Sequence, residues 1–383
     1  MKQVMIQSLQ KGNRLIRCTY RRLYAAQEEL PMKKLTCLFL IACLALFTLT
    51  AGGNKESAEV KPAKAPSIGL VLSTGGLGDK NFNDMAYEGL QKAQEALGIT
   101  FDYVEPKSPS DFLPQNRMFA EAGTYDLIIA LGNDQLEALK EIKKDFPNQK
   151  ISFIDSSAVI EGVRSVSTKW AEQTFLCGVV AGLGTLSTMD KANKENTVGV
   201  ILGMDFPNLR EGVAGFIAGV KYVNPDCDVL QATVGAFNDP GKGKEIALSM
   251  YNRGADFIQH IAGASGLGVF NAAKQVNRYA FGVGGNQNHL EPDHIVATSI
   301  RNVNDMVYNE VSALVDGSWS AGLQISGMKE GAVGYSTEYS NVTLPESIRT
   351  IVEQTRKKII AGELVLPTSM EALPSWTAAN QYK

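Results

Sequence analysis

The sequence predicts an α/β fold in which two doubly wound, mainly parallel sheets form two lobes with a ligand cleft between them. Three observations predict it: short aliphatic runs without alternation, amphipathic helical stretches between these runs, and a strand–loop–helix–strand unit that occurs twice. Unalternating aliphatic runs are typical of parallel strands buried on both faces. Strands that alternate with helices indicate doubly wound sheets with right-handed crossovers.

Six aliphatic runs mark the predicted strands. They lie at 68–72, 127–131, 151–154, 198–202, 256–261 and 279–283. Two of the helical stretches between them are clearly amphipathic. One places Phe82, Met85, Ala86, Leu90, Ala93 and Leu97 on a single face, and the other does the same with Leu136, Leu139, Ile142, Lys143 and Phe146.

The repeated unit raises the expected number of sheets to two. Segments 68–104 and 198–234 both read as strand, small-residue loop, helix and strand, and each resembles the opening unit of its own sheet. Sheets of this type bind ligands beyond the carboxyl ends of their strands, where two lobes would face each other across a cleft. Phe82 and Asn83 follow the first strand, so we expect them to meet a ligand in that cleft.

Composition favours a soluble protein of two domains with a small partner. The chain has 383 residues, 44% hydrophobic and 20% charged, with a formal net charge of −3. These values are ordinary for globular proteins, and the length favours two domains over one. Without a basic patch the chain has no electrostatic footprint for nucleic acid. A small neutral or zwitterionic solute is the more credible partner.

Motifs that carry enzymatic chemistry are absent from the sequence. The segment "GGLGDKN" has Asn81 where a dinucleotide fingerprint needs its third glycine, and GxxxxGK[ST], GxSxG, HExxH and CxxC do not occur. His260, on a predicted strand, is better explained as a core or cleft-edge histidine than as a general base. We therefore expect a binding protein and not an enzyme, with no cofactor and no metal site.

The N-terminal region predicts export. Residues 32–53 have lysines, an uncharged apolar run at 35–49 and then small residues, the pattern of a secretory signal. A retained N-terminal anchor is the alternative. We expect 1–31 to be a non-native or disordered extension and 54–66 to be a flexible tether. Gly52 stands where a lipoprotein signal would carry its lipid-bearing cysteine, and Cys43 follows a very short apolar run.

Several segments resemble one family in its own order. They are "GDKNFND" with "AYEGLQKA", "SFIDSSAV", "GFIAGVKYVNPD", "AFNDPGKGKEIA", "GADFIQHIAGASGLGVFNAAKQ" and "GNQNHLEPDHIVATSIRNV". The chain resembles the basic membrane protein (BMP) family of bacterial solute-binding lipoproteins, which includes purine nucleoside receptors. The resemblance implies a type I periplasmic-binding-protein-like fold that closes on a solute without chemistry and delivers it to an ABC permease in the cytoplasmic membrane.

The resemblance also implies domain limits and an oligomeric state. The N-terminal lobe is expected at 67–170 plus about 292–325, and the C-terminal lobe at 171–291 plus about 326–383. We expect a monomer in the cell envelope, either periplasmic or on the outer side of the membrane.

Four residues match positions that bind the solute in this family. Phe82 corresponds to a base-stacking aromatic, Asn83 to its polar neighbour, Asp155 to an aspartate at a strand end, and Gly263 to backbone close to the sugar. Asn133 and Asn286 are further candidates. Structural interpretations remain open for three of them: Phe82 as a helix-start staple, Asp155 as a cap and Asn286 as a turn residue.

Four other positions depart from the nucleoside-receptor pattern. Ser73 and Gly284 stand where aspartates are expected, Gly212 stands where a second stacking aromatic is expected, and the family's lysine corresponds to Asn302 or, with one residue missing, Arg301. A stack contributes about 1–3 kcal/mol and a hydrogen bond to a charged group about 1.5–3 kcal/mol, so these losses would abolish tight binding if nothing replaced them.

Two explanations of these departures follow. The solute could be another small polar molecule, or other residues could take over the lost contacts with a nucleoside; the candidates are Asn133, Trp170, Arg210, His260 and Asn286. A function of a different class is also open: a surface-exposed binding or adhesion protein with a degenerate pocket.

Overall fold

The computed structural model describes residues 64–382. The predictions for the extension, the signal segment and most of the tether fall in 1–63 and lie outside the described residues. Within 64–382, none of the helices combines the length and the apolar character needed to cross a membrane.

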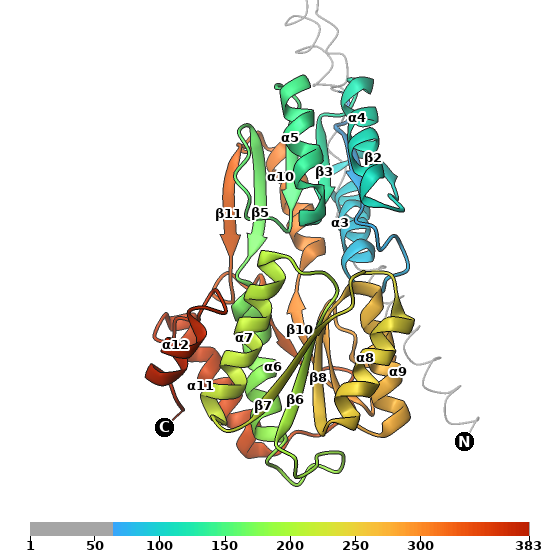
Figure 1. The fold of residues 1–383 in the computed structure, drawn as a ribbon. Coiled ribbons are helices and arrows are strands. Elements are labelled where there is room, and N and C mark those ends of the chain that lie inside the picture. Colours follow the sequence, from blue (N-terminus) through green and yellow to red (C-terminus); the bar gives the residue numbers. More distant parts are fainter. Residues whose placement is uncertain (1–63, 383) are drawn as a thin grey trace, which may run out of the picture. The chain divides into compact units, whose positions relative to one another are not determined.

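The first lobe, here called the N-lobe, is built on a six-stranded parallel sheet with the order β11-β5-β4-β3-β1-β2. Helices α3, α4, α5 and α10 belong to it (Figure 1). Its strands are β1 (Ser67–Val71), β2 (Thr100–Val104), β3 (Leu127–Leu131), β4 (Ile151–Ile154), β5 (Val163–Thr168) and β11 (Gly322–Ser326). Its helices are α3 (Phe82–Leu97), α4 (Phe112–Ala122), α5 (Leu136–Asp145) and α10 (Val303–Val315).

The second lobe, here called the C-lobe, has a six-stranded sheet with the order β12-β10-β9-β8-β6-β7, in which only the β10–β12 pair is antiparallel. Its strands are β6 (Thr197–Leu202), β7 (Asp228–Thr233), β8 (Ala255–Ile261), β9 (Tyr279–Gly284), β10 (Ile295–Arg301) and β12 (Val333–Ser336). Its helices are α6 (Trp170–Gly184), α7 (Pro207–Val223), α8 (Pro240–Asn252), α9 (Leu267–Val276), α11 (Glu346–Ala361) and α12 (Leu373–Ala379).

The two sheets repeat one topology, which confirms the predicted fold class. Strand β1 is flanked by β2 and β3, and β6 is flanked in the same way by β7 and β8. The order then continues outward through β4, β5 and β11 in the N-lobe and through β9, β10 and β12 in the C-lobe. The chain passes between the lobes three times: after β5, after β10 and after β11.

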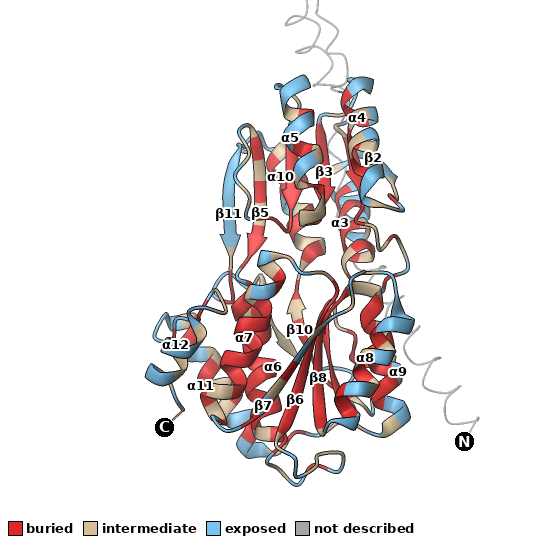
Figure 2. Ribbon diagram, viewed as in Figure 1, coloured by how far each residue is buried: buried red, intermediate tan, exposed pale blue. Residues whose placement is uncertain are grey.

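The position of the second crossing differs from the expected lobe boundary. We expected the chain to return to the N-lobe near residue 292, but β10 pairs with β9 and β12, so 292–301 belong with the C-lobe. The sequence also gave no reason to mark β5, β11 or β12 as strands. Strand β5 alternates in burial, and most of β11 is exposed at the edge of its sheet, so neither has the apolar run of a central strand (Figure 2).

Helix α6 lies at the centre of the C-lobe. Of its 15 residues 13 are buried, because α7, α11 and the sheet contact it on different sides. Glycines allow its close contact with α7: a Cβ at Gly178 would lie 2.1 Å from the Phe216 carbonyl oxygen, and one at Gly219 would lie 2.1 Å from that of Phe175. This packing supports the carboxyl ends of β6 and β8, which border the cavity described next.

Candidate functional site

A cavity lies between the lobes, at the carboxyl ends of strands from both sheets. It encloses about 640 Å³ of unfilled space, its open mouth included. The N-lobe wall contains polar groups, whereas the C-lobe wall is mainly apolar and aromatic. From the N-lobe the lining residues are Ser73, Gly75, Asp79, Asn81, Phe82, Asn83, Gly132, Asn133, Asp134 and Asp155. From the C-lobe and the crossings they are Trp170, Phe206, Asn208, Leu209, Phe237, Ile261, Ala262, Gly263, Ala264, Val283, Gly284 and Arg301.

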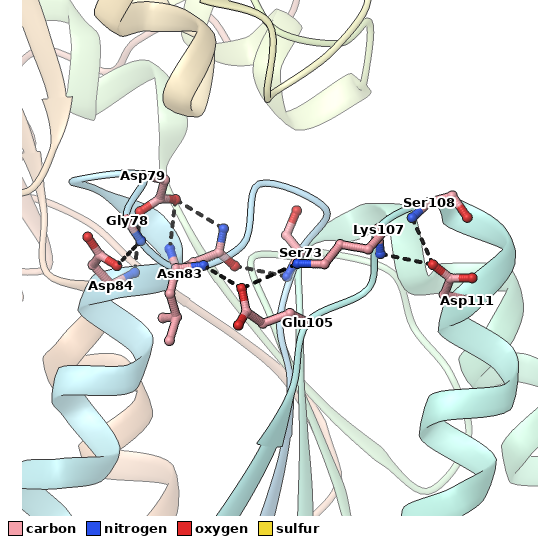
Figure 3. Close-up of polar contacts among 10 residues, drawn as sticks. Ser73, Gly78, Asp79, Asn83, Asp84, Glu105, Lys107, Ser108 and Asp111 are labelled. Carbon is pink, nitrogen blue, oxygen red and sulfur yellow. Dashed lines mark hydrogen bonds and ion pairs between the residues drawn. The ribbon is translucent and has the colours of Figure 1, made fainter.

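The loop between β1 and α3 is shaped by the carboxylate of Asp79. This carboxylate accepts hydrogen bonds from the backbone amide (3.0 Å) and from Nδ2 (3.0 Å) of Asn83 (Figure 3). It also accepts from the backbone amides of Asn81 (2.9 Å) and Asp84 (3.3 Å). Burial raises the pKa of Asp79, and the three backbone donors oppose that rise. The carboxylate therefore holds the start of α3 in place.

Asn83 has both ends of its amide engaged within this loop. Its Oδ1 accepts from the backbone amide of Ser73 (2.9 Å), and its Nδ2 donates to Asp79. It lines the cavity as predicted by the resemblance, but these contacts give it a positioning role. Direct contact between Asn83 and a solute stays a prediction.

Phe82 begins α3 and is half-buried, with part of its ring against the N-lobe core. The guanidinium of Arg301 lies 5.1 Å from the centre of this ring and 4.0 Å from the centre of the Trp170 ring. Cation–π contacts of this kind fix a flat surface at one end of the cavity. Phe82 thus packs against the N-lobe core and also borders the cavity, but it follows the N-cap Asn81 and is not in the position of a hydrophobic staple.

Asp155 and Arg301 form a buried ion pair between the end of β4 and the end of β10, with Nη1 of the arginine donating to Oδ1 of the carboxylate. Their side chains are only 8% and 6% exposed. Burial raises the pKa of Asp155, and the guanidinium opposes the rise. Asp155 has a φ of +69°, a left-handed conformation that aspartate tolerates better than most residues.

This ion pair also bears on the position of the family's lysine. Arg301 lines the cavity, whereas Asn302 directs its Nδ2 to the carbonyl oxygen of Gly331 (3.2 Å). The structure therefore favours Arg301 as the matching cation. Because Arg301 donates to Oδ1 of Asp155, one carboxylate oxygen of this predicted solute-binding residue is already hydrogen-bonded.

Asn133 and Asp134 follow β3 in a short turn, η2 (Asn133–Gln135), after Gly132 with φ +103°. Oδ1 of Asn133 accepts from Oγ of Ser156 (2.7 Å). Oδ2 of Asp134 lies 3.5 Å from Oγ of Ser73, and burial raises the pKa of Asp134 to about 7. The sequence analysis missed Asp134, although it follows a buried strand by three residues, close to the position that Asp155 holds after β4.

Two aromatic residues of the C-lobe wall were also missed. Phe206, before α7, and Phe237, after β7, have ring centres 6.3 Å apart at an angle of 37°. Gly263, with φ +55°, lies against Phe237 in the turn after β8. The backbone at Gly263 borders the cavity, as the resemblance implies.

Gly212 lies inside the α6–α7 packing and not at the cavity. A Cβ there would already be 2.9 Å from Ile261 and 3.3 Å from Trp170, so the position has no room for an aromatic ring. Phe206 stands six residues earlier, where the chain enters α7 beside the cavity. The second aromatic wall therefore comes from a different position than the alignment indicated.

Asn286 is not among the residues that line the cavity. Its Nδ2 donates toward Oγ of Ser336 (3.4 Å) and the carbonyl oxygen of Glu338 (3.2 Å). The reason is the turn at Gly284, where φ is +83° and the chain leaves the cavity edge. These contacts are typical of a turn residue, and a role of Asn286 in binding the solute stays a prediction.

At Gly284, the space that a side chain would fill is occupied by a residue of the N-lobe. A Cβ at Gly284 would lie 1.8 Å from Oδ1 of Asn81, so the Asn81 side chain takes the space expected for an aspartate. Nearby, Nε2 of Gln287 donates to the carbonyl oxygen of Lys80 (3.4 Å). These contacts join the two lobes at one side of the cavity.

Two other candidates for replacing lost contacts lie apart from the cavity lining. His260 is fully buried, packs edge-on against Phe270 at 5.0 Å, and has its pKa lowered to about 4 by burial. Arg210 is exposed and forms an ion pair with Asp205. Among residues 64–382, we find no cluster of His, Cys, Asp and Glu suited to a metal ion.

Comparison with known proteins identifies the family. The family model described as "ABC transporter substrate-binding protein PnrA-like" (Bmp) matches residues 67–369. The chain belongs to the Bmp family. It is therefore an ABC transporter substrate-binding protein, and its relatives are binding proteins and not enzymes, as predicted.

Individual relatives agree with this placement. A CD4+ T-cell-stimulating antigen of Listeria innocua is 30% identical, over 83% of this chain and 92% of its own. The ABC transporter nucleoside-binding protein BmpA of Lactococcus lactis subsp. cremoris is 28% identical, over 88% of this chain and all of its own. An ABC transporter solute-binding protein of Aeropyrum pernix K1 has a similar crystal structure, with a TM-score of 0.73 and 27% identity over 82% of this chain and 98% of its own.

Proposed function

We propose that this Bmp-family protein is the extracytoplasmic receptor of an ABC importer and that its solute is a nucleoside or a similar flat, polar molecule. One observation carries the proposal: aromatic side chains from both lobes, Phe82 and Phe206, border one cavity that also holds an arginine and three aspartates. A base–aromatic stack contributes about 1–3 kcal/mol and tolerates several bases, so two walls suit a planar ring.

Closure of the lobes would capture the solute. Phe82 belongs to the N-lobe and Phe206 to the C-lobe, so a ring between them contacts both lobes only when they are together. A ligand shifts an equilibrium by its difference in affinity for the two states, and bridging contacts supply that difference. Two contacts between the lobes also form in the closed state: the side chain of Asn81 packs against Gly284, and Gln287 donates a hydrogen bond to the carbonyl oxygen of Lys80. Separated lobes would lack both contacts.

The polar groups of the cavity would orient the solute. Arg301 has Nε buried without a hydrogen-bond partner in the described residues, which leaves it a donor for an acceptor on the solute. Asn133 and the backbone at Gly263 border the same space. The proposal includes an ABC permease as partner, a monomeric receptor, and a location in the cell envelope outside the cytoplasmic membrane.

A ligand panel tests the function. Protein purified after expression of the full chain is melted with nucleosides, free bases, sugars and amino acids. A true ligand at 100 times its Kd should stabilise the folded state by about 2.7 kcal/mol and raise the Tm accordingly. If inosine, guanosine and adenosine all leave the Tm unchanged, the nucleoside proposal is wrong. A surface adhesion protein with a degenerate pocket would respond to no member of the panel.

A further inference from the structure

Three aspartates line the cavity, and their carboxylates differ in how much hydrogen-bonding capacity remains. Asp79 already accepts four hydrogen bonds, three of them from backbone amides. Asp155 is paired with Arg301. Asp134 has a single side-chain contact, at 3.5 Å, to the hydroxyl of Ser73.

The second oxygen of Asp134 has no protein partner. Oδ1 is buried and accepts no hydrogen bond from any other residue in 64–382, and apart from Ser73 only the backbone amide of Asp134 itself favours the ionised carboxylate. A buried polar atom without a partner costs about 1–3 kcal/mol, and more for a charged group. Such an atom at the wall of a ligand cavity is explained when the ligand itself brings the donor.

The local backbone holds this carboxylate in position. Gly132 has φ +103°, and a Cβ there would lie 2.6 Å from Oδ1 of Asp134. A side chain at 132 would therefore push the carboxylate away. Ser73, only 4% exposed, lies next to Oδ2 and ends the strand beside β3.

We propose that Asp134 is the specificity-determining residue of this cavity and that its carboxylate accepts a hydrogen bond from an N–H group on the ring edge of the solute. The inference rests on the proposed function and narrows the solute to rings that carry an N–H donor, such as a 6-oxopurine. It also explains how this cavity has an acidic group beside residue 73 although that residue is serine. The carboxylate belongs to Asp134, which follows the neighbouring strand β3. Burial raises the pKa of Asp134, and an N–H donor stabilises the ionised form that such burial disfavours.

The test compares two nucleosides by isothermal titration calorimetry. Inosine has a ring N–H at position 1 and a 6-oxo group, whereas purine riboside has the same ring system and sugar but lacks both, so the change in preference caused by Asp134→Asn reports the N–H contact. We expect the wild-type protein to bind inosine at least about 10-fold more tightly, as a hydrogen bond to a charged group implies. In Asp134→Asn this preference should fall below about 3-fold.

A relocated carboxylate separates a specific role from general damage. Because Ser73 Oγ lies 3.5 Å from Asp134 Oδ2, an aspartate at 73 would place a carboxylate beside the side chain of residue 134. The double variant Asp134→Asn/Ser73→Asp should recover the preference for inosine. As a control, Asp305→Asn removes a half-exposed aspartate of the N-lobe that pairs with Lys92, and it should leave both affinities unchanged.

The outcomes are distinct. Equal wild-type affinity for inosine and purine riboside overturns the inference, and so does an Asp134→Asn variant that keeps the preference for inosine. In both cases the nucleoside function stands. Failure of the wild-type protein to bind any nucleoside overturns the proposed function together with the inference.

Discussion

The two lobes have the same strand topology, yet they present different chemistry to the cavity, although Phe82 adds an aromatic ring on the N-lobe side and Arg301 a charge on the C-lobe side. The N-lobe contributes three aspartates and Asn133, whereas the C-lobe contributes Phe206, Phe237, Leu209, Ile261 and Val283. All these residues lie in or beside the segments that follow strand ends or begin helices. One framework therefore makes a polar wall and an apolar wall, and the difference lies in the residues at the strand ends.

The comparison predicts separate tasks for the two walls. The polar wall should determine which solute binds and how the protein responds to pH. The apolar wall should determine how tightly any flat ring is held. Four experiments test this division, in order of the expected effect.

The largest effect is expected where the two walls meet, at the Asp155–Arg301 pair. Arg301→Ala would leave Asp155 buried without its cation, and loss of one partner from a buried pair costs about 3–5 kcal/mol. Urea denaturation should show this decrease in the free energy of unfolding. Lys92→Ala, at a pair with both side chains about half exposed, should change it by less than about 1 kcal/mol. Equal effects for the two variants would show that the buried pair contributes no more than a surface pair.

The next effect concerns the pH dependence of stability. Asp134 has its pKa raised by burial from 3.8 to about 7, so its proton is held more tightly in the folded state than in the unfolded chain. Its stabilising contribution is complete below pH 3.8 and is lost as the pH rises through 7. Relative to the wild type, Asp134→Asn should therefore gain stability between pH 4 and 8, on the order of 2–4 kcal/mol.

Urea denaturation at pH 4.5, 6, 7 and 8.5 measures this difference. Asp79 and the Asp155–Arg301 pair border the same cavity, but both proteins contain them, so their titration largely cancels. A constant difference between Asp134→Asn and the wild type would contradict the raised pKa.

The third experiment tests the apolar wall. Phe206→Ala removes one side of the expected stack and should weaken nucleoside binding by about 1–3 kcal/mol, with inosine and purine riboside affected alike. Calorimetry with both ligands measures it. Val365→Ala, at an exposed apolar residue of the same lobe, is the control. A loss confined to inosine would assign Phe206 to specificity and break the division between the walls.

The smallest effect is expected at the contact between Asn81 and Gly284. Gly284→Ala adds a methyl group where Oδ1 of Asn81 lies and strains a backbone with φ +83°, each at a cost of about 1 kcal/mol or more. Ligand affinity should fall because the lobes come together less well. Adding Asn81→Ala to this variant should restore the share of the ligand affinity that was lost through the clash with Asn81. Calorimetry of the double variant measures the affinity that returns.

The architecture could be predicted from the sequence because its central strands carry unalternating aliphatic runs such as 127–131 and 151–154. Strands without such a run were not predicted. Most of β11 is exposed, and β10 contains Thr298, Ser299 and Arg301, which are buried because they face the cavity or hydrogen-bond within the lobe. A prediction that relies on apolar runs alone does not find strands of this kind.

The candidate site was predicted in part, and the reason is again physical. Phe82, Asn83, Asn133, Asp155 and Gly263 line the cavity because each follows a strand end, a local relation that the sequence shows. Asp134 and Phe206 also lie beyond strand ends, three residues after β3 and four residues after β6, but the resemblance named neither position. Comparison with the family's binding positions one by one found serine at 73 and glycine at 212. The carboxylate and the aromatic ring that border the cavity instead belong to Asp134 and Phe206, which lie in other loops.

The three crossings have a consequence for how this chain can be made. Neither lobe is a continuous stretch of polypeptide, because α10 and β11 complete the N-lobe only after most of the C-lobe has been synthesised. During synthesis the N-lobe sheet must wait for its sixth strand until residue 326 has left the ribosome. A gene fragment that stops at β10 would thus yield two unfinished halves, and a stable single lobe would require rejoining the chain in a new order.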